Sequence, residues 1–325
     1  MHAGTWADVA AQSIVHGFVC AVVVEALIRL WRVAAPTERL GLRLLAVIGP
    51  LVVSPALVLA FPARASDEFR DHFAVFTARH WEDVRVLGVP LFSVWLGALT
   101  ASAVALLVMD LKPLLRRRRE LPAAPVPPAL ERTVEALAAP LRVAAPPVRF
   151  LDIAGPVLFC TGVRRPTIVV SRGTLELLDG EELEAAIAHE LAHLSARDPS
   201  VSWTLMGVRL LLFFNPAVQV VARAMARDAE ARADERAGRV GDRVALASAL
   251  LKLFRATNGD AAGGISRTLP FATALAEPFR RARTLDVEAR CLRLLEPVPA
   301  HRPELAAARV LLAAAGLFLL TVVVA

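Results

Sequence analysis

The chain has 325 residues, enough for one large domain or two small ones. Hydrophobic residues make up 56% of it and the mean hydropathy is +0.53, which is above the range of ordinary soluble domains and indicates a membrane protein. The net charge of +6 does not indicate nucleic-acid binding, because the arginines cluster beside apolar runs, where membrane topology explains them. The three cysteines are far apart and form no C-x-x-C pair, so they indicate neither a disulfide framework nor a cysteine-ligated metal.

Four apolar runs have the length and composition of transmembrane helices. They are residues 17–31, 44–61, 89–109 and 306–325. Pro50 and Pro55 interrupt the second run, but transmembrane helices tolerate proline. The alternative for the first run is a buried helix of a soluble protein. No further domain is expected after the last run.

The basic residues predict the orientation of these spans. Arginines between residues 29 and 43 separate the first two runs, and Lys112 with Arg116–Arg119 follows the third. By the positive-inside rule both basic segments are cytoplasmic. The loop over residues 62–88 and the N-terminus are then outside the cell. The expected location is therefore a bacterial-type plasma membrane, crossed several times, with the long region after the third run in the cytoplasm.

A soluble region is expected after the third run. Prolines between residues 121 and 128 predict a semi-rigid linker, and residues 129–143 have the pattern of an amphipathic helix. Three short β-rich runs separated by glycine and proline then predict a small sheet, at residues 148–153, 157–161 and 167–170. The expected domains are a membrane domain over 1–112, a linker over 113–128, a cytosolic domain over 129–300 and a transmembrane helix over 301–325.

The segment over residues 179–198 contains the pattern His-Glu-x-x-His, at His189, Glu190 and His193. Asp179 followed by Glu182 predicts a capping box, and apolar residues recur after it at helical spacing. On a helix, residues four apart lie on one face, so both imidazoles can reach one cation while Glu190 lies beside it. This is the arrangement of a zinc hydrolase. The alternative is two solvated histidines on an amphipathic helix.

A catalytic zinc needs a third protein ligand. The apolar run over residues 201–214 spans only about 21 Å as a helix, too short to cross a bilayer, so a helical hairpin is expected that returns the chain. On the returning helix, Glu230 and Asp234 are four residues apart. Glu230 is the best third ligand, and Asp234 can accept a hydrogen bond from a ligating imidazole. The alternative is a solvated charged face.

The remaining segments are expected to be helical, with one interruption. Helices are predicted over residues 240–257 and 269–295, with Pro278 inside the second, and a glycine-rich loop lies between them.

Five stretches together carry a family resemblance. They are Arg165-Pro-Thr-Ile-Val-Val170, Asp179–Glu182, His189–His193 with Arg197-Asp198, Phe213-Phe-Asn-Pro216, and Glu230-x-x-x-Asp234. In this order and spacing they resemble the membrane metallopeptidases of the β-lactam-sensor or antirepressor transducer type. They are similar, more distantly, to the CAAX-prenyl and heat-shock membrane zinc peptidases. The resemblance implies zinc on His189, His193 and Glu230, Glu190 as the general base, and Asp234 next to the ligands.

Two departures from that family pattern are expected to matter. The sensor members carry an extracellular penicillin-binding domain after the last span, and this chain is expected to lack it. Zinc peptidases often use a tyrosine to stabilise the oxyanion, and the sequence contains none. Candidates for that task are His301, Arg227 and Arg232.

The expected fold class is a mainly α membrane protein, with about four transmembrane helices and a cytosolic α+β, zincin-like peptidase domain. The expected function is an integral membrane zinc metalloendopeptidase that cleaves a cytosolic regulator of the repressor type. One alternative is a peptidase for membrane-protein quality control or processing. A second is a non-catalytic, zinc-stabilised scaffold, although such a site has no need for Glu190.

The expected cofactor is Zn²⁺. The expected partners are a protein substrate, the lipid bilayer and a separate sensor protein, with no direct nucleic acid.

Overall fold

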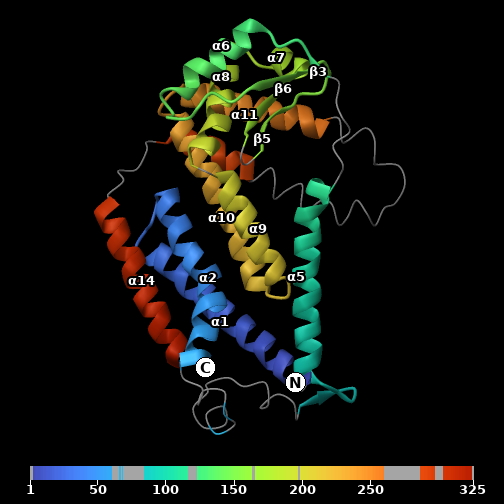
Figure 1. Cartoon of the computed structure of the whole chain (residues 1–325), viewed down its shortest axis with the longest axis vertical. Helices are drawn as coiled ribbons and strands as arrows, with labels where there is room; N and C mark the ends of the chain where they lie inside the picture. The colour runs from blue at the N-terminus through green and yellow to red at the C-terminus, as the bar shows by residue number, and fades with distance from the viewer. Residues whose placement is uncertain are drawn as a thin grey trace. The chain divides into compact units, whose positions relative to one another are not determined.

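The computed structural model describes residues 3–60, 84–115, 123–162, 165–196, 198–259, 286–296 and 303–323, together with Ser66 and Glu68. The chain divides into two compact units. The first, which we call the helical unit, comprises Met1–Arg117, Trp203–Asp228 and Pro299–Ala325. The second, the sheet unit, comprises Arg118–Ser202 and Ala229–Val298. Figure 1 labels the elements of both.

The helical unit is built from long apolar helices. They are α1 (Ala3–Leu30), α2 (Pro36–Ala60), α5 (Leu91–Leu115) and α14 (Pro303–Val323), with a two-residue hairpin of β1 (Arg85–Val86) and β2 (Val89–Pro90) before α5. Helix α2 packs against both α1 and α14. Their shared core includes Val24, Leu42 and Val47, which are almost fully buried.

All four expected spans thus form helices, and Pro50 and Pro55 lie inside α2. Among the described residues, Ser13–Leu30 of α1 is the one segment whose length and apolar composition suffice for a membrane crossing. Ser93–Ala105 of α5 is a shorter apolar stretch. The number of crossings therefore stays a prediction.

A group of charged side chains is paired inside the helical unit, and two of them, Arg43 and Asp228, are buried. Arg43 of α2 donates two hydrogen bonds to the carboxylate of Glu25 on α1, at 2.7 and 3.0 Å. The same guanidinium pairs with Asp228, which also lies 3.2 Å from Arg39. A buried charge is tolerated only when it is paired, and here two acids face two arginines. The ion pairs link α1 and α2 to the helix that carries Asp228.

That helix is α10 (Pro216–Ala237), which follows α9 (Asp198–Leu211). A turn that contains Asn215 joins them, as the predicted hairpin requires. The boundary between the two units falls within both helices.

The sheet unit contains a four-stranded mixed sheet in the order β3-β4-β6-β5. The strands are β3 (Ala123–Ala124), β4 (Val148–Leu151), β5 (Leu158–Thr161) and β6 (Thr167–Ser171). β4 and β6 are parallel, whereas the other two pairings are antiparallel. The three predicted strands are confirmed. β5 forms one edge of the sheet, and it lies beside the helix with the His-Glu-x-x-His pattern.

Helices cover this sheet and complete its core. They are α6 (Pro128–Ala138), α7 (Arg172–Leu177), α8 (Gly180–Ser195), α11 (Arg243–Gly259) and a helical stretch over residues 286–295. Helix α8 packs against α6 and α11. Its buried side joins the main core through Ile187 and Leu191, together with Ile168 and Val170 of β6. The core therefore holds α8 against the sheet.

Several predictions about this unit need correction or lie outside the described residues. Helix α6 ends at Ala138, not at residue 143, because Pro140 has no backbone N–H to continue the helical hydrogen bonds. β3, within the predicted linker, pairs with β4, and α7 was not predicted. Arg116–Arg119, residues 260–285 and His301 lie outside the described residues.

Candidate metal centre

Helix α8 positions both histidines. It begins with the predicted capping box, in which the Asp179 carboxylate accepts from the Glu182 N–H and the Glu182 carboxylate accepts from the Asp179 N–H. The helix then runs unbroken to Ser195. His189 and His193, one turn apart, bring their Nε2 atoms within 3.2 Å of each other. The local sequence of α8 alone therefore places the two imidazole nitrogens next to each other.

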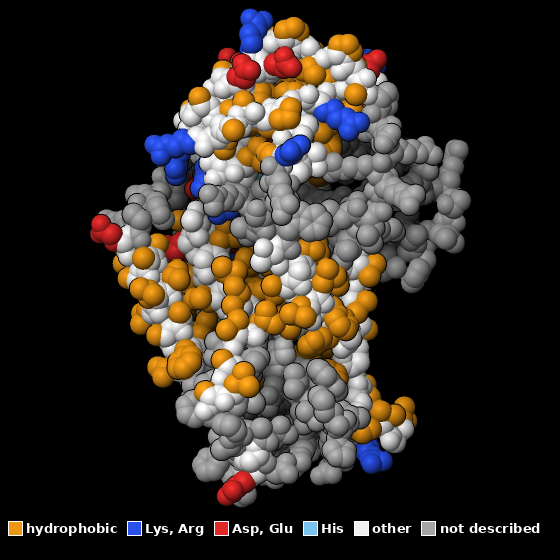
Figure 2. Space-filling model, in the orientation of Figure 1, with side chains coloured by type: hydrophobic (Ala, Val, Ile, Leu, Met, Phe, Trp, Pro, Cys, Tyr) orange, Lys and Arg blue, Asp and Glu red, His pale blue; other side chains and the backbone are white. Residues whose placement is uncertain are grey.

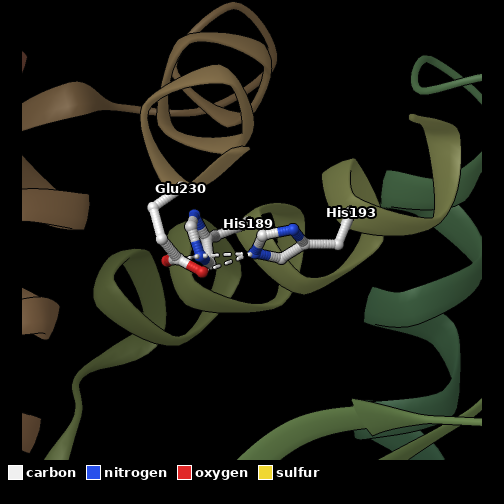
Figure 3. Close-up of side chains that lie close together, drawn as sticks. All are labelled: His189, His193 and Glu230. Atoms are coloured by element: carbon white, nitrogen blue, oxygen red, sulfur yellow. Dashed lines mark hydrogen bonds and ion pairs between the residues drawn. The ribbon is translucent and has the colours of Figure 1, made fainter. Parts of the chain in front are cut away.

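Glu230 on α10 completes a three-residue group. Its carboxylate oxygens lie 3.5 Å from the Nε2 atom of His189 and 3.5 Å from that of His193. Figure 3 shows the three side chains converging from the two helices. Tetrahedral zinc, with ligand distances of about 2.0–2.1 Å, keeps its ligand atoms roughly 3.3 Å apart. The separations of these donors therefore fit one cation of that kind.

The group is accessible from one side. The side chain of His189 is 7% exposed, that of His193 is 18% exposed and that of Glu230 is 41% exposed. A structural metal site is closed by four protein ligands, whereas a catalytic site has three and leaves a position for water or substrate. Three donors with one exposed side correspond to the catalytic type.

The electrostatics of the group favour a bound cation. Burial lowers the pKa of His189, but hydrogen bonds with Asp234 and Glu230 outweigh burial and raise it to about 10. Burial raises the pKa of Glu230, but His189 and Arg290 lower it to about 2, so this carboxylate is ionised at neutral pH. The two carboxylates, of Asp234 and Glu230, thus stabilise the protonated, positively charged imidazole of His189. A metal ion would replace that proton, because a ligating imidazole is neutral.

Asp234 lies behind one of the candidate ligands, His189. Its Oδ1 atom is 3.0 Å from His189 Nδ1, on the side of the ring opposite Glu230. A carboxylate there orients the ring and makes it a stronger donor. Burial raises the pKa of Asp234, but the partners Arg290 and His189 outweigh it, and the pKa is lowered.

Arg290 is the residue that sequence reasoning missed. Its guanidinium binds Asp234 with two hydrogen bonds, at 2.9 and 2.7 Å, and lies 3.0 Å from Glu230 Oε2. Its Nη2 atom is also 3.4 Å from His189 Nε2. The residue follows Asp234 by 56 positions in a helix that carries several charges, so no local pattern distinguished it. It places a fixed positive charge at the group.

Glu190 lies beside the two histidines and faces the sheet. Its Oε2 atom accepts a hydrogen bond of 2.8 Å from the backbone N–H of Cys160, on the edge strand β5. Burial raises the pKa of Glu190, which outweighs the lowering by His189 and His193. A general base needs a pKa closer to neutral than a free carboxylate has. The position and the direction of the shift both suit that role.

The predicted oxyanion stabilisers stay predictions. Arg227 and Arg232 are both on α10, the helix of Glu230, and His301 lies outside the described residues. Arg290 is a further candidate, because its guanidinium already contacts the group.

Comparisons with known proteins agree with this geometry. The family model described as "BlaR1 peptidase M56" matches residues 54–269. Three of the similar curated proteins are each named "Protease HtpX homolog". That of Aquifex aeolicus is 30% identical over 168 residues (39% of this chain and 55% of that protein). That of Ralstonia pickettii is 31% identical over 185 residues, and that of Ralstonia nicotianae 33% over 186, each covering 46% of this chain and 61% of the relative. The matches thus span little more than half the length of these relatives.

Proposed function

Because the chain belongs to the M56 family of peptidases, we propose that it is an integral membrane zinc metalloendopeptidase that cleaves a protein substrate on the cytosolic side. The observation that carries the proposal is the convergence of His189, His193 and Glu230 with Glu190 next to them. The ligand atoms of His189, His193 and Glu230 lie within 4.8 Å of one another. A scaffold would need the ligands alone, so the presence of Glu190 favours an enzyme.

His189, His193 and Glu230 would hold the zinc ion. When bound there, zinc polarises the scissile carbonyl and lowers the pKa of water toward about 7. Glu190 takes a proton from the attacking water and passes it to the leaving amine. Asp234 keeps the His189 ring in its ligating orientation. Arg290 compensates the negative charge of Glu230 and Asp234, and its guanidinium is a candidate to stabilise an oxyanion.

The surface of the helical unit supports a membrane location with several crossings. Hydrophobic side chains predominate on the face of this unit that Figure 2 draws. Large apolar side chains are exposed on four separate helices: Phe18, Val22, Leu44, Val52, Val94, Trp95, Leu311, Leu312, Phe318 and Leu319. Monomeric soluble proteins rarely expose apolar area on this scale, whereas lipid-facing helices do so throughout.

Two classes of substrate are consistent with this chemistry. We propose a cytosolic regulator, because the family model described as "BlaR1 peptidase M56" matches most of the chain and the sequence motifs resemble those of transducer-type peptidases. Membrane-protein quality control is the second candidate, favoured by the similarity to proteins named "Protease HtpX homolog". In both cases the bond is a peptide bond and the machinery is the same.

The proposal is tested by comparing wild type with Glu190→Gln. We expect the wild type to generate new protein N-termini in the cell and Glu190→Gln to generate none, with equal metal content in the purified proteins. Glu184→Gln, an exposed carboxylate on the same helix, is the matched control and retains cleavage. Full cleavage by Glu190→Gln would show that the general base is another residue. The identity of the cleaved proteins, soluble regulators or membrane proteins, decides between the two classes.

A further inference from the structure

In and around the turn between α9 and α10, several large apolar side chains are exposed whereas the polar side chains are buried. Leu210, Leu211, Phe213 and Val220 are 43–61% exposed. The polar side chains of the same stretch, Arg209, Asn215 and Gln219, are at most 7% exposed. In water the opposite distribution is stable, because exposed apolar surface is costly and polar groups prefer solvent.

The buried polar side chains of the turn bind one another. Arg209 Nε donates to Gln219 Oε1 at 2.9 Å, and Gln219 Nε2 donates back to the Arg209 carbonyl at 3.1 Å. This reciprocal pair joins the two helices across the hairpin. It lets a charged residue face the inside of the helical unit, which is where charges in lipid-embedded helices are found.

Asn215 supplies the hydrogen bonds that the turn itself requires. Its Oδ1 atom accepts from the N–H groups of Ala217 and Val218, at 3.1 and 3.3 Å, and so caps α10. Its Nδ2 atom donates to the Ser13 carbonyl of α1 at 2.7 Å. The backbone of the turn is bonded internally as well, since Leu212 N–H donates to Val208 and Asn215 N–H donates to Leu212.

Hydrocarbon permits irregular backbone only where hydrogen bonds are made within the protein. We therefore propose that residues 205–222 form a re-entrant hairpin whose tip lies among lipid acyl chains without crossing the bilayer. Helix α9 has 14 residues, about 21 Å, and so reaches less far than the roughly 30 Å hydrocarbon core. Helix α10 then leads the chain back to the side from which it came. This inference rests on the proposed membrane peptidase.

The hairpin would connect the catalytic helices to the bilayer. Its first arm belongs to α9, which begins three residues after the end of α8, the helix of His189, and its second arm belongs to α10, the helix of Glu230. The lipid contact of Phe213 and its neighbours would fix the depth at which both helices leave the membrane.

Nitroxide labels at single cysteines in lipid nanodiscs test the inference. The native Cys20, Cys160 and Cys291 are replaced by alanine, and labels are introduced by Phe213→Cys, Leu311→Cys on α14, or Val244→Cys, an exposed apolar residue of α11. We expect the first two labels to collide with oxygen at least several-fold more than with a water-soluble nickel complex. The label at Val244→Cys should show the reverse preference.

Each outcome has a distinct meaning. If the Leu311→Cys label is in lipid while the Phe213→Cys label resembles Val244→Cys, the hairpin inference is overturned and the membrane proposal stands. If neither label is in lipid, the proposed membrane architecture itself fails. Protection of Phe213→Cys from both reagents would mean that a protein partner covers the tip, which also overturns the inference.

A second measurement needs no cysteine replacement. A charge within hydrocarbon is costly, so Phe213→Asp should reduce the yield of folded, membrane-integrated protein several-fold, whereas Val244→Asp should leave it unchanged. Equal yields of the two variants would contradict a lipid environment at the tip.

Discussion

Arg290 binds two acidic side chains of the metal centre at once, and only one of its partners is a proposed ligand. Asp234 is almost fully buried, so its carboxylate depends on Arg290 and His189 for compensation of its charge. The arginine therefore contributes to stability as well as to the charge of the candidate metal centre.

Replacing Arg290 by methionine keeps the apolar part of the side chain but removes the guanidinium that donates two hydrogen bonds to Asp234. We expect a loss of about 3 kcal/mol in the free energy of unfolding, because a buried charge is left without its partner. Arg290→Lys should recover only part of this, since an ammonium cannot bind a carboxylate with two parallel hydrogen bonds. Denaturant titration in detergent measures both variants.

Arg172 provides the matched control for that experiment. It also contacts two carboxylates, of Asp152 and Glu176, but on the surface, where ion pairs contribute little. Arg172→Met should leave the unfolding midpoint unchanged. Equal effects of the two arginine substitutions would contradict the role assigned to Arg290.

Glu182 stabilises the N-terminus of helix α8. Besides the capping box, the Glu182 carboxylate accepts from Ser248 at 2.6 Å and from Lys252 at 2.5 Å, both on α11. The beginning of the ligand-bearing helix is thereby joined to its neighbour.

This arrangement predicts a pH dependence of stability. Burial raises the pKa of Glu182, but bonds from Lys252 and Ser248 outweigh it, and the folded-state pKa lies below the ordinary value of 4.5. A lowered pKa stabilises the fold above the unfolded-state value and loses this effect as the pH falls through the folded-state value. Wild type should therefore exceed Glu182→Gln in unfolding midpoint at neutral pH, and the difference should shrink below about pH 4.5. A pH-independent difference would contradict this origin.

The hairpin of α9 and α10 is seated on α1 at Gly17. A Cβ atom added there would lie 2.5 Å from Asn215 Nδ2, which is held by its hydrogen bond to Ser13. We expect Gly17→Ala to lower the free energy of unfolding by about 1–3 kcal/mol, because Asn215 cannot withdraw without losing that bond.

Gly49 of α2 is the control, because a Cβ there would meet Cys20 at an ordinary contact distance of 3.7 Å. Gly49→Ala should be neutral or slightly stabilising, since alanine favours helix over glycine. Thermal unfolding of the two variants in the same detergent makes the comparison. A Gly17→Ala protein as stable as Gly49→Ala would mean that α1 and the turn are not in close contact.

At the scale of the whole molecule, the elements with strong local patterns were predictable from sequence. A residue pattern within the segment itself identifies the strands β4, β5 and β6. The same is true of the helix α8, whose capping residues are also local. The two-residue strand β3 and the six-residue helix α7 do not, because pairing and packing with distant segments create them. The same holds for Arg290, whose contacts join residues far apart in the chain.

The orientation predicted by the arginines has a direct test. Leu87, fully exposed in the turn between β1 and β2, is expected outside the cell, and Val244 inside. A membrane-impermeant maleimide should label Leu87→Cys in intact cells, but Val244→Cys only after the membrane is opened, with wild type as the background. Labelling of Val244→Cys in intact cells would reverse the proposed topology.

The metal content of the purified chain tests directly whether His189, His193 and Glu230 form a metal site. We expect about one zinc ion per wild-type chain by elemental mass spectrometry, the same in Glu184→Gln, and a large loss in His193→Ala and Glu230→Ala. Zinc content that is unchanged in Glu230→Ala would remove the third ligand. It would also contradict the central claim that two helices hold one cation between them.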